Sequence, residues 1–147
     1  MIIRPINKSA TDIEGLTILM NGWDDLVFEL TRDYIEDKIN KFLSLPNAEI
    51  LIARTPAGEM TGYACLAEVI FLGMEPFIEL QSILVREDHR GNGVGASLME
   101  AAEKWTKEKG FSKIVLSSRI QLSKSHAFYR RLGYTVFKQS YYFQKEL

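Results

Sequence analysis

The hydrophobic pattern of the first third of the chain predicts one short strand and two helices. Residues 1–5 (MIIRP) are typical of a strand. Between Asp12 and Gly22 apolar residues recur at helical spacing, and we expect Asp12 to cap this helix and Gly22 to end it. A second helix is predicted after its expected cap, Thr31, and it ends before Pro46.

The rest of the pattern predicts three consecutive strands and then alternating helices and strands. The three strands are residues 49–54, 60–72 and 77–85, which turn residues separate. They are followed by a helix from the glycine-rich segment to residue 109, which Gly110 should end, and by a strand at 113–118. A helix at 124–132, which Gly133 should end, and a closing hairpin of strands 134–138 and 141–145 complete the chain. The order β-α-α-β-β-β-α-β-α-β-β indicates a mixed α/β or α+β fold.

Length and composition indicate one globular domain, residues 1–147, and exclude several classes of partner. The hydrophobic content of 46% and the charged content of 25% are ordinary for a packed domain. A net charge of −1 gives no basic surface of the kind that binds nucleic acid. No apolar run approaches the ~18 residues that cross a bilayer, and the N-terminal apolar stretch is too short for a signal peptide. We therefore expect no nucleic-acid or membrane partner.

Cysteine and histidine usage predicts a reduced protein without a metal site. Cys65 is the only cysteine, so no intramolecular disulfide is expected. His89 and His126 have no carboxylate at ligand spacing, so we predict no bound metal. These observations favour a cytoplasmic location.

Glycines are concentrated immediately before the helix that ends near residue 109. In HRGNGVG (residues 89–95) three glycines occur within five residues, and each loses more conformational entropy on folding than any other residue would. A helix start exposes unpaired N–H groups and the positive end of the helix dipole, so glycines there let a phosphate approach closely. Arg90 adds a positive charge. A flexible turn before an ordinary helix is the alternative.

Two nucleotide-binding patterns fit this segment poorly. Gly91, Gly93 and Ala96 match G-x-G-x-x-A, a form of the dinucleotide fingerprint. However, five polar residues separate Val85 from Gly91, and too few strands follow for a doubly wound fold. No Gly-Lys-Ser/Thr follows the glycines, so the Walker pattern is absent. NAD and nucleoside triphosphates are therefore disfavoured.

Two motifs resemble those of the GNAT superfamily of acyl-CoA-dependent N-acyltransferases. Arg90-x-x-Gly93-x-Gly95 is similar to the family's Q/R-x-x-G-x-G/A, within ILVREDHRGNGVGASLMEAAEKW. SHAFYRRLGY resembles its A-x-x-F-Y-x-x-x-G-F/Y segment, so the likeness covers residues 77–137. It implies a GNAT-like α+β fold, with a mixed, mostly antiparallel sheet of about seven strands, about four flanking helices, and a splay at the cofactor slot.

The resemblance also implies a co-substrate, acetyl-CoA or coenzyme A, and the residues that hold it. In the family the pyrophosphate lies on the helix N-terminus, and the pantetheine arm pairs with the preceding strand. The cofactor-binding residues implied in this sequence are Ile83, Leu84, Val85, Arg90, Gly91, Asn92, Gly93, Val94, Gly95, Ala96, Ser125 and Tyr129. The family's asparagine falls on Leu122 here and its alanine on Ser125, so Ser123 or Ser125 would have to replace that side-chain contact.

Acetyl transfer to an amine needs a base for the nitrogen and a proton donor for the departing thiolate. Tyr129 occupies the tyrosine position of the resembled family and is the expected acid, although packing against Phe128 alone would give it a structural role. Glu79 is the expected base, because an acidic residue inside a strand is rarely buried without purpose. Simple alternation puts it on one face with Phe77, Gln81, Ile83 and Val85. Glu68, on the preceding strand, is the alternative base.

The expected activity is an N-acetyltransferase that moves acetyl from acetyl-CoA to a primary amine of a small molecule or peptide by direct attack. A non-catalytic acyl-CoA sensor or interaction module is the alternative. The acceptor stays open among aminoglycosides, polyamines, amino acids, peptide N-termini and lysines. We interpret Asp24, Asp25 and Glu29 as a solvated charge run, although in the resembled family this loop borders the acceptor. Tyr141, Tyr142 and Phe143 would offer a surface for a homodimer.

Overall fold

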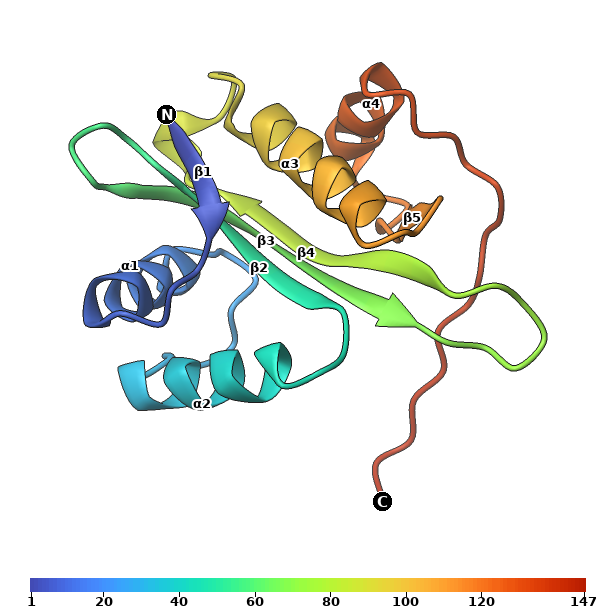
Figure 1. The fold of residues 1–147 in the computed structure, drawn as a ribbon, viewed down its shortest axis with the longest axis horizontal. Helices are drawn as coiled ribbons and strands as arrows, with labels where there is room; N and C mark the ends of the chain where they lie inside the picture. The colour runs from blue at the N-terminus through green and yellow to red at the C-terminus, as the bar shows by residue number, and fades with distance from the viewer. The chain divides into compact units, whose positions relative to one another are not determined.

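A five-stranded sheet organises the first of two parts of the chain. The computed structural model describes residues 1–147, which divide into the parts 1–117 and 118–147. The sheet follows chain order: β1 (Ile2–Pro5), β2 (Ala48–Arg54), β3 (Met60–Val69), β4 (Phe77–Val85) and β5 (Ile114–Leu116). The strands β1 to β4 are antiparallel, and β5 runs parallel to β4 (Figure 1). The mixed, mostly antiparallel sheet predicted from the sequence is confirmed.

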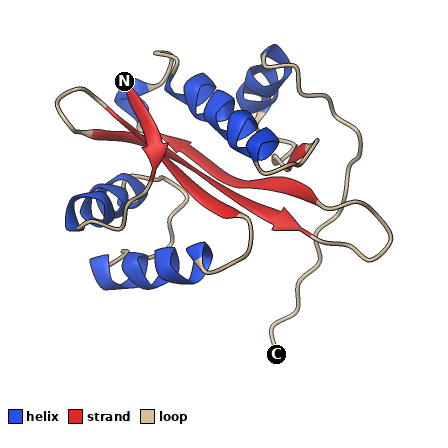
Figure 2. Cartoon of the chain, in the orientation of Figure 1, coloured by secondary structure: helices blue, strands red, loops and turns tan.

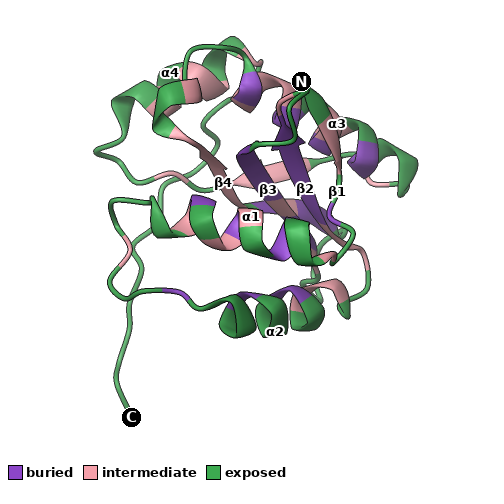
Figure 3. Cartoon of the chain, turned by 90° about the vertical axis from the view of Figure 1, so that its left-hand side faces the viewer, coloured by how far each residue is buried: buried purple, intermediate pink, exposed green.

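Helices cover both faces of this sheet. On one face lie α1 (Ala10–Asn21) and α2 (Arg32–Leu43), and on the other lies α3 (Val94–Glu108) (Figure 1). Buried residues concentrate on the central strands and on the sides of the helices that face the sheet (Figure 3). The core beneath α1 and α2 includes Ile13, Leu16, Leu19, Ile35, Ile39, Ile50 and Ile52. None of the helices, of which α3 is the longest with 15 residues, is long and apolar enough to cross a bilayer.

Helix α1 starts earlier than predicted, because Ser9 and not Asp12 is its cap. Ser9 has an extended backbone, and its Oγ accepts the N–H of Asp12 at 3.2 Å. The sequence Ser9-Ala10-Thr11-Asp12 does contain the serine-x-x-acid pattern of a helix start, which would have identified this cap. The predictions for the other ends are confirmed: Gly22 ends α1, and Thr31 Oγ1 caps α2 by accepting the Tyr34 N–H.

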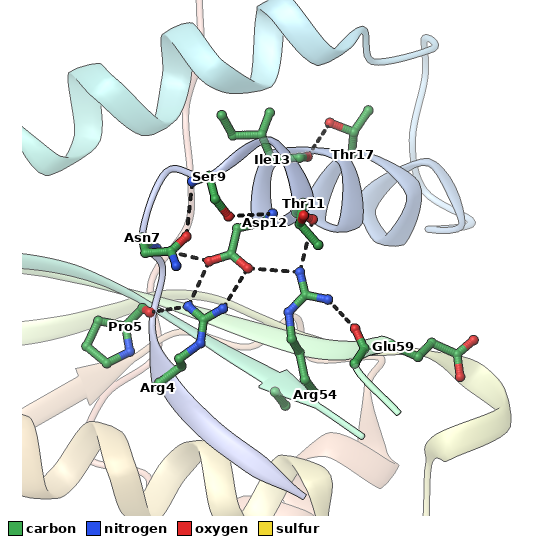
Figure 4. Close-up of polar contacts among 12 residues, drawn as sticks. Arg4, Pro5, Asn7, Ser9, Thr11, Asp12, Ile13, Thr17, Arg54 and Glu59 are labelled. Atoms are coloured by element: carbon green, nitrogen blue, oxygen red, sulfur yellow. Dashed lines mark hydrogen bonds and ion pairs between the residues drawn. The ribbon is translucent and has the colours of Figure 1, made fainter. Parts of the chain in front are cut away.

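The Asp12 carboxylate instead joins β1, α1 and β2 from a buried position. It is 1% exposed and accepts bonds from the Arg4 guanidinium at 2.7 and 2.8 Å and from Arg54 Nη2 at 2.9 Å (Figure 4). The Asn7 N–H donates to it at 3.0 Å. Burial alone would raise the pKa of Asp12, but the bonds from these donors, that of Arg4 first, hold it below its usual value.

The second part, residues 118–147, contains one helix and no strand (Figure 2). The helix α4 (Ser123–Arg131) is followed by Gly133 with a φ of +88°, so the predicted helix and its glycine stop are confirmed. The closing hairpin at 134–138 and 141–145 is absent, and the sheet therefore has five strands instead of about seven. A strand exists only by pairing, and Tyr141, Tyr142 and Phe143 are 91, 85 and 94% exposed, with no alternation of buried and exposed faces.

Two strands are shorter than the sequence predicts. The strand expected at 60–72 ends at Val69, because Leu72 and its neighbours form the turn before β4. The strand expected at 113–118 is reduced to Ile114–Leu116, the three residues that pair with β4. After β3 the apolar run continues through Ile70, Phe71 and Leu72 into the turn, so apolar pattern alone overestimates the length of that strand.

Candidate functional site

The turn that leads into α3 leaves the first N–H groups of the helix without a side-chain cap. We call residues 90–93 the glycine turn; it follows the short 3-10 helix η1 (Glu87–His89). Gly91 and Gly93 have φ angles of +80° and +82°, in the left-handed region that glycine adopts most readily. A Cβ at either position would meet no atom within 4 Å. The backbone dihedrals therefore require these two glycines, whereas Gly95 lies inside α3 with no such angle.

The helix start has the properties of an anion site. The glycine turn is exposed, and the first turn of α3 carries no acidic residue. The leading N–H groups of a helix have no intrahelical acceptor, and its dipole is positive at this end. Arg90 is also exposed, and its Nε donates to the Val85 carbonyl at 3.0 Å, which ties the glycine turn to the end of β4. Phosphate oxygens are suitable ligands for this arrangement.

The sheet opens beside the glycine turn. β5 pairs with β4 only at Ile78–Ile114, Glu79–Val115 and Leu80–Leu116. Beyond Leu80 no strand pairs with β4 on that side, so the stretch Ile83–Val85 has one unpaired backbone edge. An extended polar chain can add to such an edge through main-chain hydrogen bonds.

A β-bulge at Gln81 divides β4 into two stretches. Cys65 of β3 pairs with Ser82, whereas the next residue, Leu66, pairs with Leu80. Gln81 is therefore an extra residue, and it is exposed. A bulge of this kind turns the side chains after it to the opposite face from the one that simple alternation predicts.

The bulge corrects the predicted face of β4. The group expected together was Phe77, Glu79, Gln81, Ile83 and Val85. In the structure Glu79 shares a face with Leu84, which packs against the core beneath α1 and α2. Ile83 and Val85 instead share the α3 face with Leu80. Glu79 is half-buried on the α1 and α2 side of the sheet.

Glu68 lies one residue pair from Glu79 but on the opposite face. Glu68 pairs with Ile78, and Glu79 pairs with Ala67, so their side chains alternate across the sheet. The Glu68 Oε2 accepts a hydrogen bond from Asn47 Nδ2 at 2.8 Å. The interpretation of Glu68 as a second base next to Glu79 is therefore not supported by the geometry.

Gly62 of β3 allows α3 to approach the sheet closely. A Cβ on Gly62 would lie 2.9 Å from the Leu84 carbonyl oxygen, 3.1 Å from Leu98 Cδ1 and 3.2 Å from Val94 Cγ1. Because Val94 is the first residue of α3, this contact fixes the helix start against β3 and β4. Gly62 was not among the predicted site residues, although a glycine inside an apolar strand is a signal of close approach.

Arg86 connects η1 to the turn between β2 and β3. It donates to Glu59 Oε1 at 2.5 Å and to the two carboxylate oxygens of Asp88 at 2.6 and 3.0 Å. Its Nη2 lies 3.0 Å from His89 Nδ1. The bonds from Arg86 lower the pKa of Glu59 and, with a contribution from His89, lower the pKa of Asp88 to about 2. Residues 86–90 were predicted only as a polar spacer, and no local pattern indicated that Glu59 comes near.

Tyr129 and Ser125 lie on α4, in the second part. The Tyr129 ring contacts the rings of Phe128 and Tyr134, with centroids 5.2 and 6.1 Å apart. Burial raises the pKa of Tyr129, so its hydroxyl keeps its proton at neutral pH. Ser125 precedes Tyr129 by one helical turn on the same face and is half-buried. Leu122 occupies the cap position and provides no side-chain hydrogen bond.

A shallow pocket of about 440 Å³, wide open to solvent, lies in the loop between α1 and α2. Its lining consists of Asn21, Trp23, Leu26, Val27, Phe28 and Glu29. Asn21 holds the loop, since its Nδ2 donates to the Leu30 carbonyl at 2.9 Å and its Oδ1 accepts the Leu30 N–H at 2.8 Å. Glu29 is exposed, as expected of a solvated charge, and it lines this pocket together with the exposed residues Trp23 and Phe28.

Comparison with known proteins identifies the family to which this chain belongs. The sequence profile of the acetyltransferase (GNAT) family matches residues 16–134, which include the glycine turn, α3 and α4. The chain belongs to the GNAT acetyltransferase family. It is accordingly an acetyl-CoA-dependent N-acetyltransferase, as the two motifs implied.

Several relatives of this GNAT protein have named activities. It is 27% identical over 151 residues to the aminoglycoside N(6')-acetyltransferase type 1 of Klebsiella aerogenes, covering 99% of this chain and 97% of that protein. It is 30% identical to the enzyme of the same name from Stenotrophomonas maltophilia, over 84% of this chain and 78% of that protein. An L-methionine sulfoximine/L-methionine sulfone acetyltransferase of Pseudomonas paraeruginosa is 33% identical over 59% of this chain and 51% of that protein.

Solved structures confirm the fold. The aminoglycoside 6'-N-acetyltransferase of Acinetobacter haemolyticus matches with a TM-score of 0.79 and 24% identity, over 100% of this chain and 99% of that one. Another aminoglycoside N-acetyltransferase, crystallised with coenzyme A, matches with a TM-score of 0.82 and 21% identity, over 99% of this chain and 95% of that one. At these identities the likeness establishes the GNAT fold.

Proposed function

We propose that this enzyme acetylates a primary amine of a small cationic molecule, with Glu79 as the general base and Tyr129 as the proton donor. The observation that carries the proposal is the uncapped start of α3, with its two left-handed glycines, next to an unpaired stretch of β4. Half-buried Glu79 lies on this same strand. The stretch of β4 proposed to bind acetyl-CoA and the proposed base, Glu79, therefore lie on the same strand.

The residues fit coenzyme A as a co-substrate. The pyrophosphate would accept bonds from the first N–H groups of α3, namely those of Val94, Gly95 and Ala96, with Arg90 as the nearby cation. The space above Gly91 and Gly93 is open, since a Cβ at either would meet nothing within 4 Å. The amide groups of the pantetheine arm would pair with the edge of Ile83–Val85 that has no strand partner, apart from the Val85 carbonyl, which already accepts a bond from Arg90 Nε. The chemistry that the co-substrate supplies is an activated acetyl thioester.

The expected proton transfers follow from the chemistry of the two side chains. The amine nitrogen attacks the thioester carbonyl carbon, the carbon–sulfur bond breaks, and acetyl becomes an amide. Glu79 takes the proton that the nitrogen loses, directly or through a water, and Tyr129 supplies a proton to the departing sulfur. Its raised pKa keeps Tyr129 a donor at neutral pH.

Direct transfer is favoured over a covalent acetyl-enzyme. Burial raises the pKa of the Cys65 thiol to about 11, so that at neutral pH it is almost entirely protonated. A thiol in that state is a poor nucleophile, and Cys65 lies inside β3. No other cysteine is present.

A small cation is the favoured acceptor. The pocket between α1 and α2 combines the carboxylate of Glu29 with the rings of Trp23 and Phe28, and these groups attract an ammonium by charge and by cation–π contact. Glu79 points to the sheet face on which α1 and α2 lie. Two relatives carry the name of aminoglycoside N(6')-acetyltransferase, and aminoglycosides are polycations. Amino-acid analogues are the second candidate, because another relative acetylates L-methionine sulfoximine and sulfone.

The decisive experiment measures thiol release from acetyl-CoA with a panel of amines: an aminoglycoside, a polyamine, L-methionine sulfoximine and a short peptide. We expect release with the aminoglycoside or polyamine above the rate without acceptor. Release only with the amino-acid analogue or the peptide would contradict the cationic acceptor. Coenzyme A binding without release for any amine would favour a non-catalytic sensor.

Gly93→Val tests the proposed pyrophosphate site. A β-branched residue is strained at a φ of +82°, so the glycine turn should rearrange. We expect coenzyme A to raise the melting temperature of the wild type and not that of the variant. The Gly110→Val variant carries the same kind of strain, with a φ of +86°, just beyond the opposite end of α3, and it should keep the coenzyme A response.

A further inference from the structure

The contacts of Arg86 extend from a rigid anchor to the glycine turn. The anchor is the turn between β2 and β3, in which the Thr55 N–H donates to the Glu59 carbonyl and the Gly58 N–H to the Thr55 carbonyl, both at 2.9 Å. The Arg54 guanidinium, which is bound to buried Asp12, also donates to the Gly58 carbonyl. Glu59 therefore presents its carboxylate from backbone that is held at several points.

On its other side Arg86 organises η1. Its backbone N–H donates to the Thr61 carbonyl at 2.9 Å, and its carbonyl accepts the His89 N–H at 2.9 Å. The guanidinium holds both oxygens of Asp88, and the Arg90 N–H donates to the Glu87 carbonyl at 3.1 Å. The conformation of η1 determines where the chain enters the glycine turn.

We propose that Arg86 is a positioning residue: it clamps η1 to the carboxylate of Glu59 and thereby keeps the glycine turn in the shape that receives the pyrophosphate. The inference rests on the proposed coenzyme A site. Arg86 is not a phosphate ligand in this arrangement, because its Nε, Nη1 and Nη2 all bond to Glu59 or Asp88. Exposed Arg90 is the cation that remains for the ligand.

The bonds of Arg86 preorganise the glycine turn, and we expect their loss to reduce coenzyme A affinity moderately. Arg86 is 30% exposed, and its partners Glu59 and Asp88 are 56 and 64% exposed, so water and salt weaken the pairs. We expect Arg86→Gln and Glu59→Gln each to weaken coenzyme A binding about three- to tenfold. The turnover rate at saturating acetyl-CoA should stay close to that of the wild type, since neither residue touches the reacting atoms.

A double-mutant cycle separates the clamp from its alternatives. Coenzyme A dissociation constants are measured by calorimetry for the wild type, the two single variants and the double variant, with Asp37→Asn as the matched control. Asp37 forms an exposed ion pair with Lys41 on α2, so that variant also removes a surface charge. If Arg86 acts through its bond to Glu59, the double variant should bind coenzyme A no more weakly than either single variant. Asp37→Asn should bind coenzyme A as the wild type does.

Three results would contradict the proposal that Arg86 positions the glycine turn through Glu59. If Arg86→Gln weakens binding and Glu59→Gln does not, the bond to Glu59 has no role, and Arg86 acts through Asp88 or on the phosphates directly. If both bind as the wild type, the glycine turn keeps its shape unaided. If the wild type itself binds no coenzyme A, the proposed function fails and the clamp with it. Glu59→Gln decides the outcome even where Arg86→Gln folds poorly, because Glu59 is on an exposed turn.

Discussion

Gly62→Ala should strain the packing where β3, β4 and the start of α3 meet, and the structure gives the size of the effect. The new Cβ would stand 2.9 Å from the Leu84 carbonyl oxygen, closer than real Cβ atoms come to other heavy atoms. The side chains of Val94 and Leu98 can yield by tenths of an ångström, but the Leu84 carbonyl belongs to a paired strand. Overpacking of this kind costs about 2 kcal/mol, which for a chain of this length lowers the Tm by roughly 4–8 °C.

The assay compares thermal melting and coenzyme A titration for Gly62→Ala, wild type and Gly73→Ala. A Cβ on Gly73 would meet no atom within 4 Å, and its φ is not left-handed, so this control should keep the wild-type Tm or gain slightly. The KM for acetyl-CoA should rise in Gly62→Ala alone, because the strained contacts involve β4 and the first residue of α3, the two elements of the proposed coenzyme A site. A wild-type Tm and KM in Gly62→Ala would refute the close approach of α3 on which this reasoning depends.

The remaining predictions concern the proposed chemistry and the buried ion pairs. Glu79→Gln should lower kcat about 10²–10⁴-fold with little change in coenzyme A affinity, whereas a rise in acceptor KM alone would leave Glu79 as an anchor for the cation. Tyr129→Phe should lower kcat at an unchanged Tm, and unchanged turnover would leave the residue structural. Asp12→Ala should lower the free energy of unfolding by roughly 3–5 kcal/mol in chemical denaturation, against about 0.5 kcal/mol for the exposed control Asp37→Ala. Because the pKa of Asp12 is lowered in the folded state, its contribution is complete above the unfolded value of about 4 and is lost as the pH falls through the folded value, so wild type and Asp12→Ala should converge in stability in acid.

Local chemistry made much of this protein predictable. The cap at Thr31, the stop at Gly22 and the left-handed glycines at 110 and 133 depend on dihedrals and hydrogen bonds within a few residues, and the sequence contains all of that information. The bounds of β4 follow in the same way from flanking turns and were predicted correctly. The two motifs also identified the family, because their spacing records a local loop–helix arrangement.

Contacts between distant segments decided the rest. The bulge at Gln81 depends on register with β3, which the sequence of β4 does not contain, and so the face of Glu79 could not be assigned from alternation. The prediction of Asp12 as a helix cap was wrong, because its carboxylate binds Arg4 and Arg54, which only the folded sheet brings to it.

The sequence by itself determined the order of elements as far as α4, the glycine turn and the type of chemistry. The tertiary structure alone decided which side chains meet: Glu59 with Arg86, 27 residues apart, and Gly62 with the start of α3. The physical reason is range. Dihedral preferences and caps act over one turn of chain, whereas ion pairs and close packing depend on strand register and helix docking, which only the completed sheet fixes.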